Sequence, residues 1–99
     1  MTIANAVFPL RIPADHPSLP GHFPGQPIVP GVLLLDAVAE ALYTSRGHRL
    51  TQVVEAKFLS PLLPEQVAEL RLTDHGGRVL FEIRFEDRCL ARGTVRGEP

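Results

Sequence analysis

Apolar and polar residues alternate along most of the second half of the chain, and this period of two predicts β-strands. The clearest run covers residues 78–86 (RVLFEIRFE), in which every second side chain is apolar and charged ones lie between. Weaker alternation predicts strands at 51–59, 66–73 and 89–96. The sequence DHGG at 74–77 is typical of a hairpin turn, so the strands follow one another as an antiparallel meander.

Residues 31–46 (GVLLLDAVAEALYTSR) show no alternation, and their nearly continuous apolar character predicts one helix. A helix that is apolar all round is expected to be buried all round. Asp36 and Glu40 are exceptions that lie four residues apart, so they share one face. Gly47 suits the left-handed residue that commonly follows the end of a helix.

The first third of the chain holds little regular structure. Residues 6–12 resemble a strand, but Pro9 has no N–H to donate, which confines this strand to a sheet edge. Residues 13–30 contain six prolines and two glycines. Each proline fixes its own φ and extends its predecessor, so this segment is predicted to be a stiff loop. The last residues, 97–99, are predicted to be a tail.

These elements predict an α+β fold with an antiparallel sheet of about five strands curled around one central helix. A chain of 99 residues is expected to form a single domain, residues 1–99. A domain this small buries a modest share of its surface, so pairing with a second copy is also expected.

Composition narrows the range of functions. The net charge of −1 favours neither nucleic acid nor a membrane surface as a partner. Cys89 is the one cysteine, so no disulfide can form within the chain, and no spacing of His and Cys suggests a metal site. No apolar run is long enough to span a bilayer and no signal peptide is recognised, so a cytoplasmic protein without a cofactor is predicted.

The helix start is the first candidate for chemistry. Val29, Pro30 and Gly31 precede the apolar run, and none of them supplies the side-chain oxygen that usually caps a helix. The first N–H groups are then open to a ligand oxygen, which the positive end of the helix would favour. The alternative is that Gly31 and water cap the helix.

Two side chains near this point could move protons. His22 lies in the stiff loop between small residues, and imidazole is well matched to proton transfer near neutral pH. Asp36 lies in an apolar helix, where burial would help it to hold its proton as a general acid. The alternatives are a structural role for His22 and an ion pair between Asp36 and an arginine of the sheet.

Residues 21–33 (GHFPGQPIVPGVL), followed by an acid at position 36, closely resemble the β-hydroxyacyl-(acyl-carrier-protein) dehydratases. The resemblance continues at residues 57–64 (KFLSPLLP), and the other strands match in pattern alone. It implies the hotdog fold of that family. It also implies a lyase that converts a 3-hydroxyacyl thioester on acyl-carrier protein into the trans-2-enoyl thioester and water.

The resemblance assigns roles to individual residues. His22 matches the histidine that takes the α-proton, and Asp36 matches the acid that protonates the departing hydroxyl. The Gly31 N–H matches the group that binds the thioester carbonyl. Further substrate contacts are expected from Phe23, Pro30, Val32 and Glu40. In the family, the histidine and the acid of one site come from two subunits, so a homodimer or larger homo-oligomer is expected.

Two positions depart from the family pattern. The family usually has Glu where this chain has Asp36, and often Gln where it has Glu40; dehydratases resembling those of aryl-polyene pathways also carry Asp. A specialised relative is therefore one interpretation. The alternatives are a hotdog acyl thioesterase and a non-catalytic hotdog subunit that binds acyl-carrier protein. Arg46, Arg49 and Lys57 are candidates for docking such an acidic carrier.

Overall fold

A computed structural model describes residues 5–17, 19 and 28–99 of the chain. It contains five strands and one helix, which are β1 (Asn5–Leu10), α1 (Gly31–Arg46), β2 (Arg49–Phe58), β3 (Ala68–His75), β4 (Arg78–Phe85) and β5 (Arg88–Glu98). His22 and Phe23, two of the predicted site residues, lie outside the described residues.

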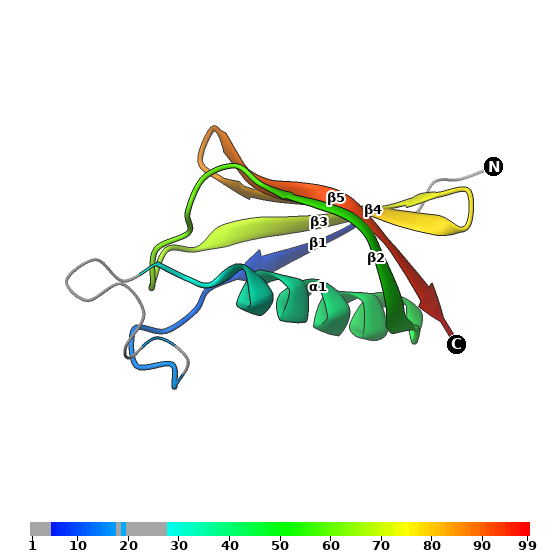
Figure 1. Cartoon of the computed structure of the whole chain (residues 1–99), viewed down its shortest axis with the longest axis horizontal. Coiled ribbons are helices and arrows are strands. Elements are labelled where there is room, and N and C mark those ends of the chain that lie inside the picture. The colour runs from blue at the N-terminus through cyan, green and yellow to red at the C-terminus, as the bar shows by residue number, and fades with distance from the viewer. Residues whose placement is uncertain (1–4, 18, 20–27) are drawn as a thin grey trace.

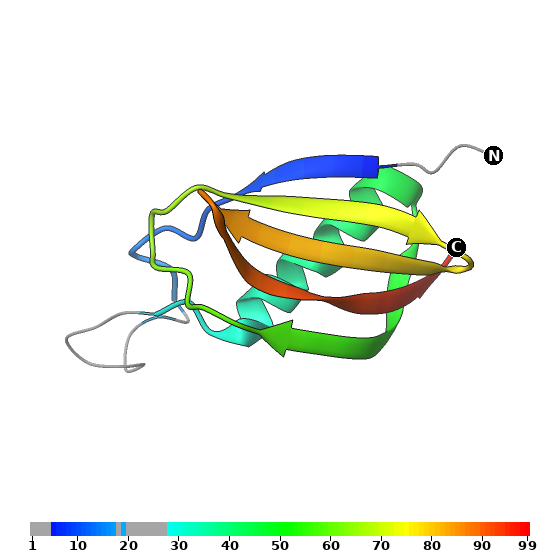
Figure 2. The ribbon, with the colours of Figure 1, turned by 90° about the horizontal axis from the view of Figure 1, so that it is seen from above.

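The five strands form one antiparallel sheet in the order β1-β3-β4-β5-β2. The helix α1 lies along one face of this sheet, which curves over it (Figures 1 and 2). The predicted α+β architecture is therefore confirmed. The strand β1 lies at an edge and pairs with β3, with Pro9 opposite Glu69, as the missing N–H of proline requires.

Helix α1 has the bounds that the sequence predicts. Gly47 follows it with φ 69°, and the N–H of Gly47 donates a hydrogen bond to the carbonyl of Tyr43 at 2.8 Å. A residue with a Cβ adopts this left-handed geometry reluctantly, whereas glycine adopts it readily. The local chemistry of the chain thus sets where the helix ends.

Several strand ends differ from the prediction. The β3–β4 turn contains two residues, Gly76 and Gly77, with φ of 55° and 80°, and residues 74 and 75 belong to β3. Two positive φ values match the twist of a tight hairpin, so the strands continue right up to the turn. The predicted tail at 97–99 is wrong for residues 97 and 98, because β5 extends to Glu98 and pairs with the beginning of β2.

The core lies between the helix and the inner face of the sheet. The helix contributes Leu33, Leu34, Val38, Ala41 and Leu42. The expectation that α1 is buried all round is wrong for this single chain, since Val32 and Tyr43 are 62% and 61% exposed. A single sheet covers one side of a helix, and the far side of α1 keeps its apolar residues on the surface.

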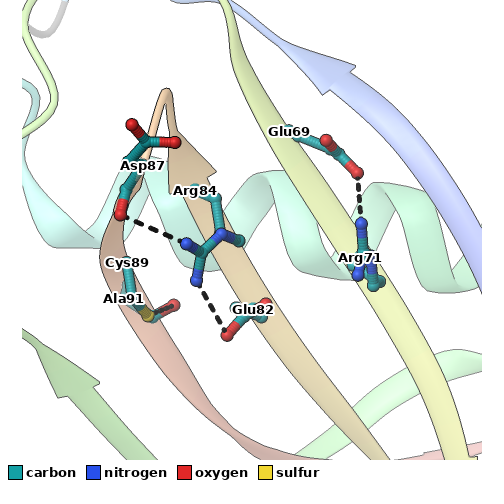
Figure 3. Close-up of polar contacts among 7 residues, drawn as sticks. All are labelled: Glu69, Arg71, Glu82, Arg84, Asp87, Cys89 and Ala91. Atoms are coloured by element: carbon teal, nitrogen blue, oxygen red, sulfur yellow. Dashed lines mark hydrogen bonds and ion pairs between the residues drawn. The ribbon is translucent and has the colours of Figure 1, made fainter.

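The outer face of the sheet carries the charged residues, as the alternation predicts. On this face Arg71 donates to Glu69 at 2.8 Å, Arg84 lies 3.6 Å from Glu82, and Arg84 also donates to the carbonyl of Asp87 (Figure 3). These pairs are half-exposed, and exposed ion pairs contribute little to stability. Their role is to keep this face of the sheet compatible with water.

Strand β2 departs from simple alternation. Its pairing with β5 shifts register twice, between Leu50 and Gln52 and between Val53 and Glu55. At the second shift Val53 and Val54 are consecutive and both exposed, 40% and 36%. An extra residue in one strand breaks the two-residue period, which explains the weak alternation of residues 51–59.

Gly93 allows β2 and β5 to approach closely. A Cβ at Gly93 would overlap the carbonyl oxygen of Glu55 and lie 2.6 Å from a ring carbon of Phe81. We expect Gly93→Ala to lower the free energy of unfolding by about 2 kcal/mol or more, as overpacking does. Thermal and urea denaturation would measure the change. Thr94→Ala, on the same strand, is the control, and equal stability of the two variants would contradict this account.

Candidate active site

The helix start has the open N–H groups that the sequence predicts. Pro30 occupies the N-cap position with extended geometry and provides no side-chain hydrogen bond. The N–H of Leu33 donates to the carbonyl of Pro30 at 3.0 Å, whereas those of Gly31 and Val32 have no acceptor among the described residues. The N-terminus of α1 is therefore able to bind an oxygen that carries negative charge.

The residues before the helix are held by the connection between β2 and β3. The N–H of Val29 donates to the carbonyl of Leu62 at 2.9 Å, and both side chains are buried. The N–H groups of Leu59 and Ser60 in turn donate to the carbonyl of Leu90. The helix start is thus fixed to the β2–β3 connection and through it to β5, and a group that binds a reacting oxygen requires such a rigid support.

Phe58 closes the space beside the helix start, and sequence reasoning gave it no role. Its ring lies so near Gly31 that a Cβ there would be 3.1 Å from the ring carbon Cζ. Both residues line a cavity of about 360 Å³ together with parts of 28–34 and 59–62. The end of a strand in the second segment of family resemblance, 57–64, is the signal that could have identified Phe58.

Asp36 and Glu40 lie on the exposed face of α1, so the predicted burial of Asp36 is wrong for this single chain. The cause is the one-sided cover of the helix by the sheet. The two carboxylates line a cavity of about 530 Å³ between α1, β1 and the segment after β1. Asp36 forms no ion pair with a described arginine, so the alternative of a structural ion pair is not observed.

Two further residues with charged or titratable side chains line this cavity, His16 and Arg11. Sequence reasoning treated His16 as an ordinary loop residue and did not consider Arg11. The fold brings them to the carboxylates because the segment after β1 lies beside α1 at this cavity. A turn at residues 13–16 holds His16, whose N–H donates to the carbonyl of Pro13 at 3.0 Å.

The predicted site residues do not all meet in one place. Gly31 and the half-buried Pro30 lie at the helix start, and Gly31 lines the smaller cavity. Asp36 and Glu40 line the larger one. Val32 points away from the sheet and is exposed. In a single chain, the helix N-terminus and the acid therefore line different cavities.

The three arginine and lysine residues considered for docking differ in their surroundings. Arg46 is held inside the fold, because its Nε donates to Asp74 at 2.7 Å and its side chain is 12% exposed. Arg46 is therefore a wrong prediction for a docking residue. Arg49 and Lys57 are exposed at the two ends of β2.

Neither a metal cluster nor a membrane-spanning helix occurs in the described part of the chain. Across residues 5–17, 19 and 28–99, no group of three or more His, Cys, Asp or Glu side chains is placed to hold a metal ion. The one described helix, α1, lacks the length and apolar character required to cross a membrane.

Comparisons with known proteins show the family of the chain. Residues 2–94 match the sequence model of the ApeI-like family, described as ApeI dehydratase. The 3-hydroxyacyl-(acyl-carrier-protein) dehydratase FabZ of Haemophilus influenzae strain PittEE is 35% identical over 98 residues. That of the Rd strain KW20 is 38% identical over 98 residues. Each alignment covers 89% of this chain, which spans 63% of the length of these relatives.

Solved structures share the architecture. The dehydratase heterocomplex ApeI:P from Xenorhabdus doucetiae contains a chain with a TM-score of 0.83 at 24% identity, covering 96% of this chain and 88% of the other. An uncharacterized protein from Erwinia carotovora subsp. atroseptica gives a TM-score of 0.84 at 27% identity, covering 98% and 85%. The fold is thus the hotdog fold, and the chain belongs to the ApeI-like dehydratase family.

Proposed function

We propose that the protein dehydrates a 3-hydroxyacyl thioester carried by acyl-carrier protein and releases the trans-2-enoyl thioester and water. The observation that supports this most directly is Asp36, a carboxylate without an ion pair to a described residue in a cavity with largely apolar walls. The relatives named FabZ, of whose length the chain spans 63%, have this activity in their name.

In the proposed reaction each group has one task. His22 takes the α-proton, and the electrons of that C–H bond form the new double bond. Asp36 gives its proton to the β-hydroxyl, whose C–O bond breaks so that water leaves. Meanwhile the thioester oxygen gains negative charge, which the open N–H of Gly31 and the positive end of α1 stabilise.

The proposed active unit contains two copies of the chain. Within the described sheet, β2 is an edge strand that pairs with β5 alone, and it exposes Val53, Val54 and Phe58. The adjacent helix exposes Val32 and Tyr43. An unpaired, apolar edge next to an apolar helix surface is a natural interface for a second copy. His22 of one copy would then serve Asp36 of the other.

The proposed partner is an acidic acyl-carrier protein, with Arg49 and Lys57 as the remaining candidates for contact. A cytoplasmic location is proposed, because the proposed substrate is carried by an acyl-carrier protein. The free cysteine Cys89 is also typical of proteins in a reducing compartment. No cofactor is needed, because an acid, a base and hydrogen-bond donors suffice for the elimination of water.

One assay separates the candidate functions. Incubation with a 3-hydroxyacyl carrier thioester should produce the ultraviolet absorbance of the conjugated enoyl thioester. Release of free thiol instead would support a thioesterase, in which the helix start and the carboxylate direct water at the carbonyl. Binding of the carrier with neither product would support a non-catalytic subunit and would refute the proposed function.

The contact between Gly31 and Phe58 gives a prediction on substrate binding. Gly31→Ala would place a methyl group 3.1 Å from the Phe58 ring and narrow the smaller cavity. We expect kcat/KM for the carrier substrate to fall by about 10-fold, as one misplaced carbon in a pocket does. Adding Phe58→Leu should recover part of the loss. An unchanged kcat/KM in Gly31→Ala would show that the substrate does not approach this point.

A further inference from the structure

Glu65 has an unusual backbone conformation. It is one of two described residues other than glycine with a positive φ, at 71°. Left-handed backbone is unfavourable for a residue with a Cβ, and it persists where surrounding contacts hold it in place. Glu65 lies in the connection between β2 and β3, so the contacts that hold it there are informative.

Three contacts join Glu65 to the segment that follows β1. Its N–H donates to the carbonyl of Ile12 at 2.8 Å. One carboxylate oxygen, Oε2, accepts the N–H of Ala14 at 2.8 Å. The other, Oε1, accepts Nη1 of Arg11, 54 residues away in the sequence. Both carboxylate oxygens of Glu65 thus accept a hydrogen bond, and one of these bonds holds the Arg11 guanidinium.

The ionised form of Glu65 is favoured by these contacts. The Ala14 hydrogen bond first, and then the charge and hydrogen bond of Arg11, lower the pKa of Glu65 from its ordinary value. A carboxyl with a lowered pKa keeps its native contacts above that value and loses them as the pH falls through it. Glu65 therefore holds Arg11 throughout the neutral range.

Arg11 also lines the larger cavity, where the charged and titratable groups are Arg11, His16, Asp36 and Glu40. The Arg11 side chain is 49% exposed and has several rotatable bonds. The two carboxylates of α1, Asp36 and Glu40, are the acidic side chains that line this cavity together with Arg11. An arginine beside a carboxyl stabilises the ionised form, and an ionised Asp36 has no proton to give.

We infer that Glu65 is a positioning residue that holds the Arg11 guanidinium away from Asp36 and Glu40, so that Asp36 can carry the proton delivered to the leaving hydroxyl. This inference rests on the proposed function for the role of that proton. The placement of Arg11 itself is independent of any reaction, and it can be measured in the protein without substrate.

The first measurement is the titration of the Asp36 carboxyl by carbon NMR in the wild-type protein and in Glu65→Gln. Gln keeps the size of Glu65 but has no charge to hold Arg11. We expect the Asp36 titration to move to lower pH by about one unit or more, as an adjacent arginine causes. The double variant Glu65→Gln with Arg11→Met should return it to the wild-type position.

The second measurement is the pH dependence of kcat/KM for dehydration. The alkaline limb reports loss of the proton from the acid, so in Glu65→Gln it should move to lower pH by the same amount. Above the new limb, kcat/KM should fall by about 10-fold for each pH unit by which the limb has moved. The double variant should restore the limb, which a purely structural defect would not allow.

The chain offers a matched control and a second variant. Glu69→Gln frees Arg71 from a comparable half-exposed ion pair on the outer face of the sheet, away from the larger cavity, and should leave the Asp36 titration unchanged. Glu65→Gly removes the same charge, and glycine readily adopts the positive φ of this position. It therefore tests the inference if Glu65→Gln folds poorly.

Two results would overturn the inference. One is an Asp36 titration that Glu65→Gln and Glu65→Gly leave unchanged. The other is a change in that titration that Arg11→Met does not reverse, because the effect would then not pass through Arg11. Absence of dehydration by the wild-type protein would refute the proposed function instead, and the NMR titration would still decide the placement of Arg11.

Discussion

Asp36→Asn is expected to reduce the rate of dehydration by about 10²–10⁴-fold, the usual contribution of a general acid. The amide keeps the shape of the side chain but cannot give a proton to the leaving hydroxyl. His22→Ala is expected to cause a loss of the same order, since it removes the proposed base. Both losses are measured as the initial rate of enoyl thioester formation, with circular dichroism as the check on folding.

Asp87→Asn is a suitable control for the same chemical change. Asp87 is an exposed residue of the β4–β5 turn, and its contact with Arg84 uses the backbone carbonyl, not the carboxylate. Turnover by Asp36→Asn at the rate of Asp87→Asn would refute the assignment of Asp36 as the acid.

Mixing the two inactive variants tests how the site is assembled. If His22 and Asp36 of one site come from different copies, each mixed dimer contains one intact site. Random exchange of subunits should then restore about a quarter of the wild-type activity. If both residues act within one copy, the mixture should remain as inactive as its components.

The second large effect is expected at the edge of the sheet. Val53→Lys places a charge on β2, where the unpaired strand and its exposed apolar residues are proposed to meet a second copy. A lysine on an edge strand opposes pairing with another strand, so we expect a monomer by sedimentation analysis. Dehydration should fall by about 100-fold or more, because separated copies no longer hold the base and the acid in register.

The opposite edge of the sheet provides the matched control. Val7 lies on β1 and is 54% exposed, comparable with Val53 at 40%. Val7→Lys should remain dimeric and active, because β1 is not part of the proposed interface. A dimeric and active Val53→Lys variant would contradict the proposed interface.

The interpretation of the chain as a specialised relative of the dehydratases rests on the helix face that carries Asp36 and Glu40. The two carboxylates lie one helical turn apart, and both are exposed. The Arg11–Glu65 ion pair adds a second influence, which lies outside both segments of family resemblance. Under the proposed function, Arg11 and Glu65 would influence the acid from outside the family motif.

The sequence determined those features that depend on neighbours along the chain. The bounds of α1 were predicted correctly, since the Val29-Pro30-Gly31 start and the left-handed Gly47 act locally. The alternation of residues 78–86 predicted β4, and Pro9 predicted an edge strand. The motif at 21–33 indicated the family, which the matching of residues 2–94 confirmed. The roles of His22 and Asp36 remain predictions.

The tertiary structure decided what depends on contacts between distant residues. No local pattern could show that one side of α1 remains uncovered, because burial is set by the curvature and extent of a sheet formed from five separate segments. The same holds for the two register shifts of β2 and for the Arg46–Asp74 pair. Arg11 and Glu65 meet across 54 residues, and only the fold brings Arg11 into the same cavity as the carboxylates of the helix.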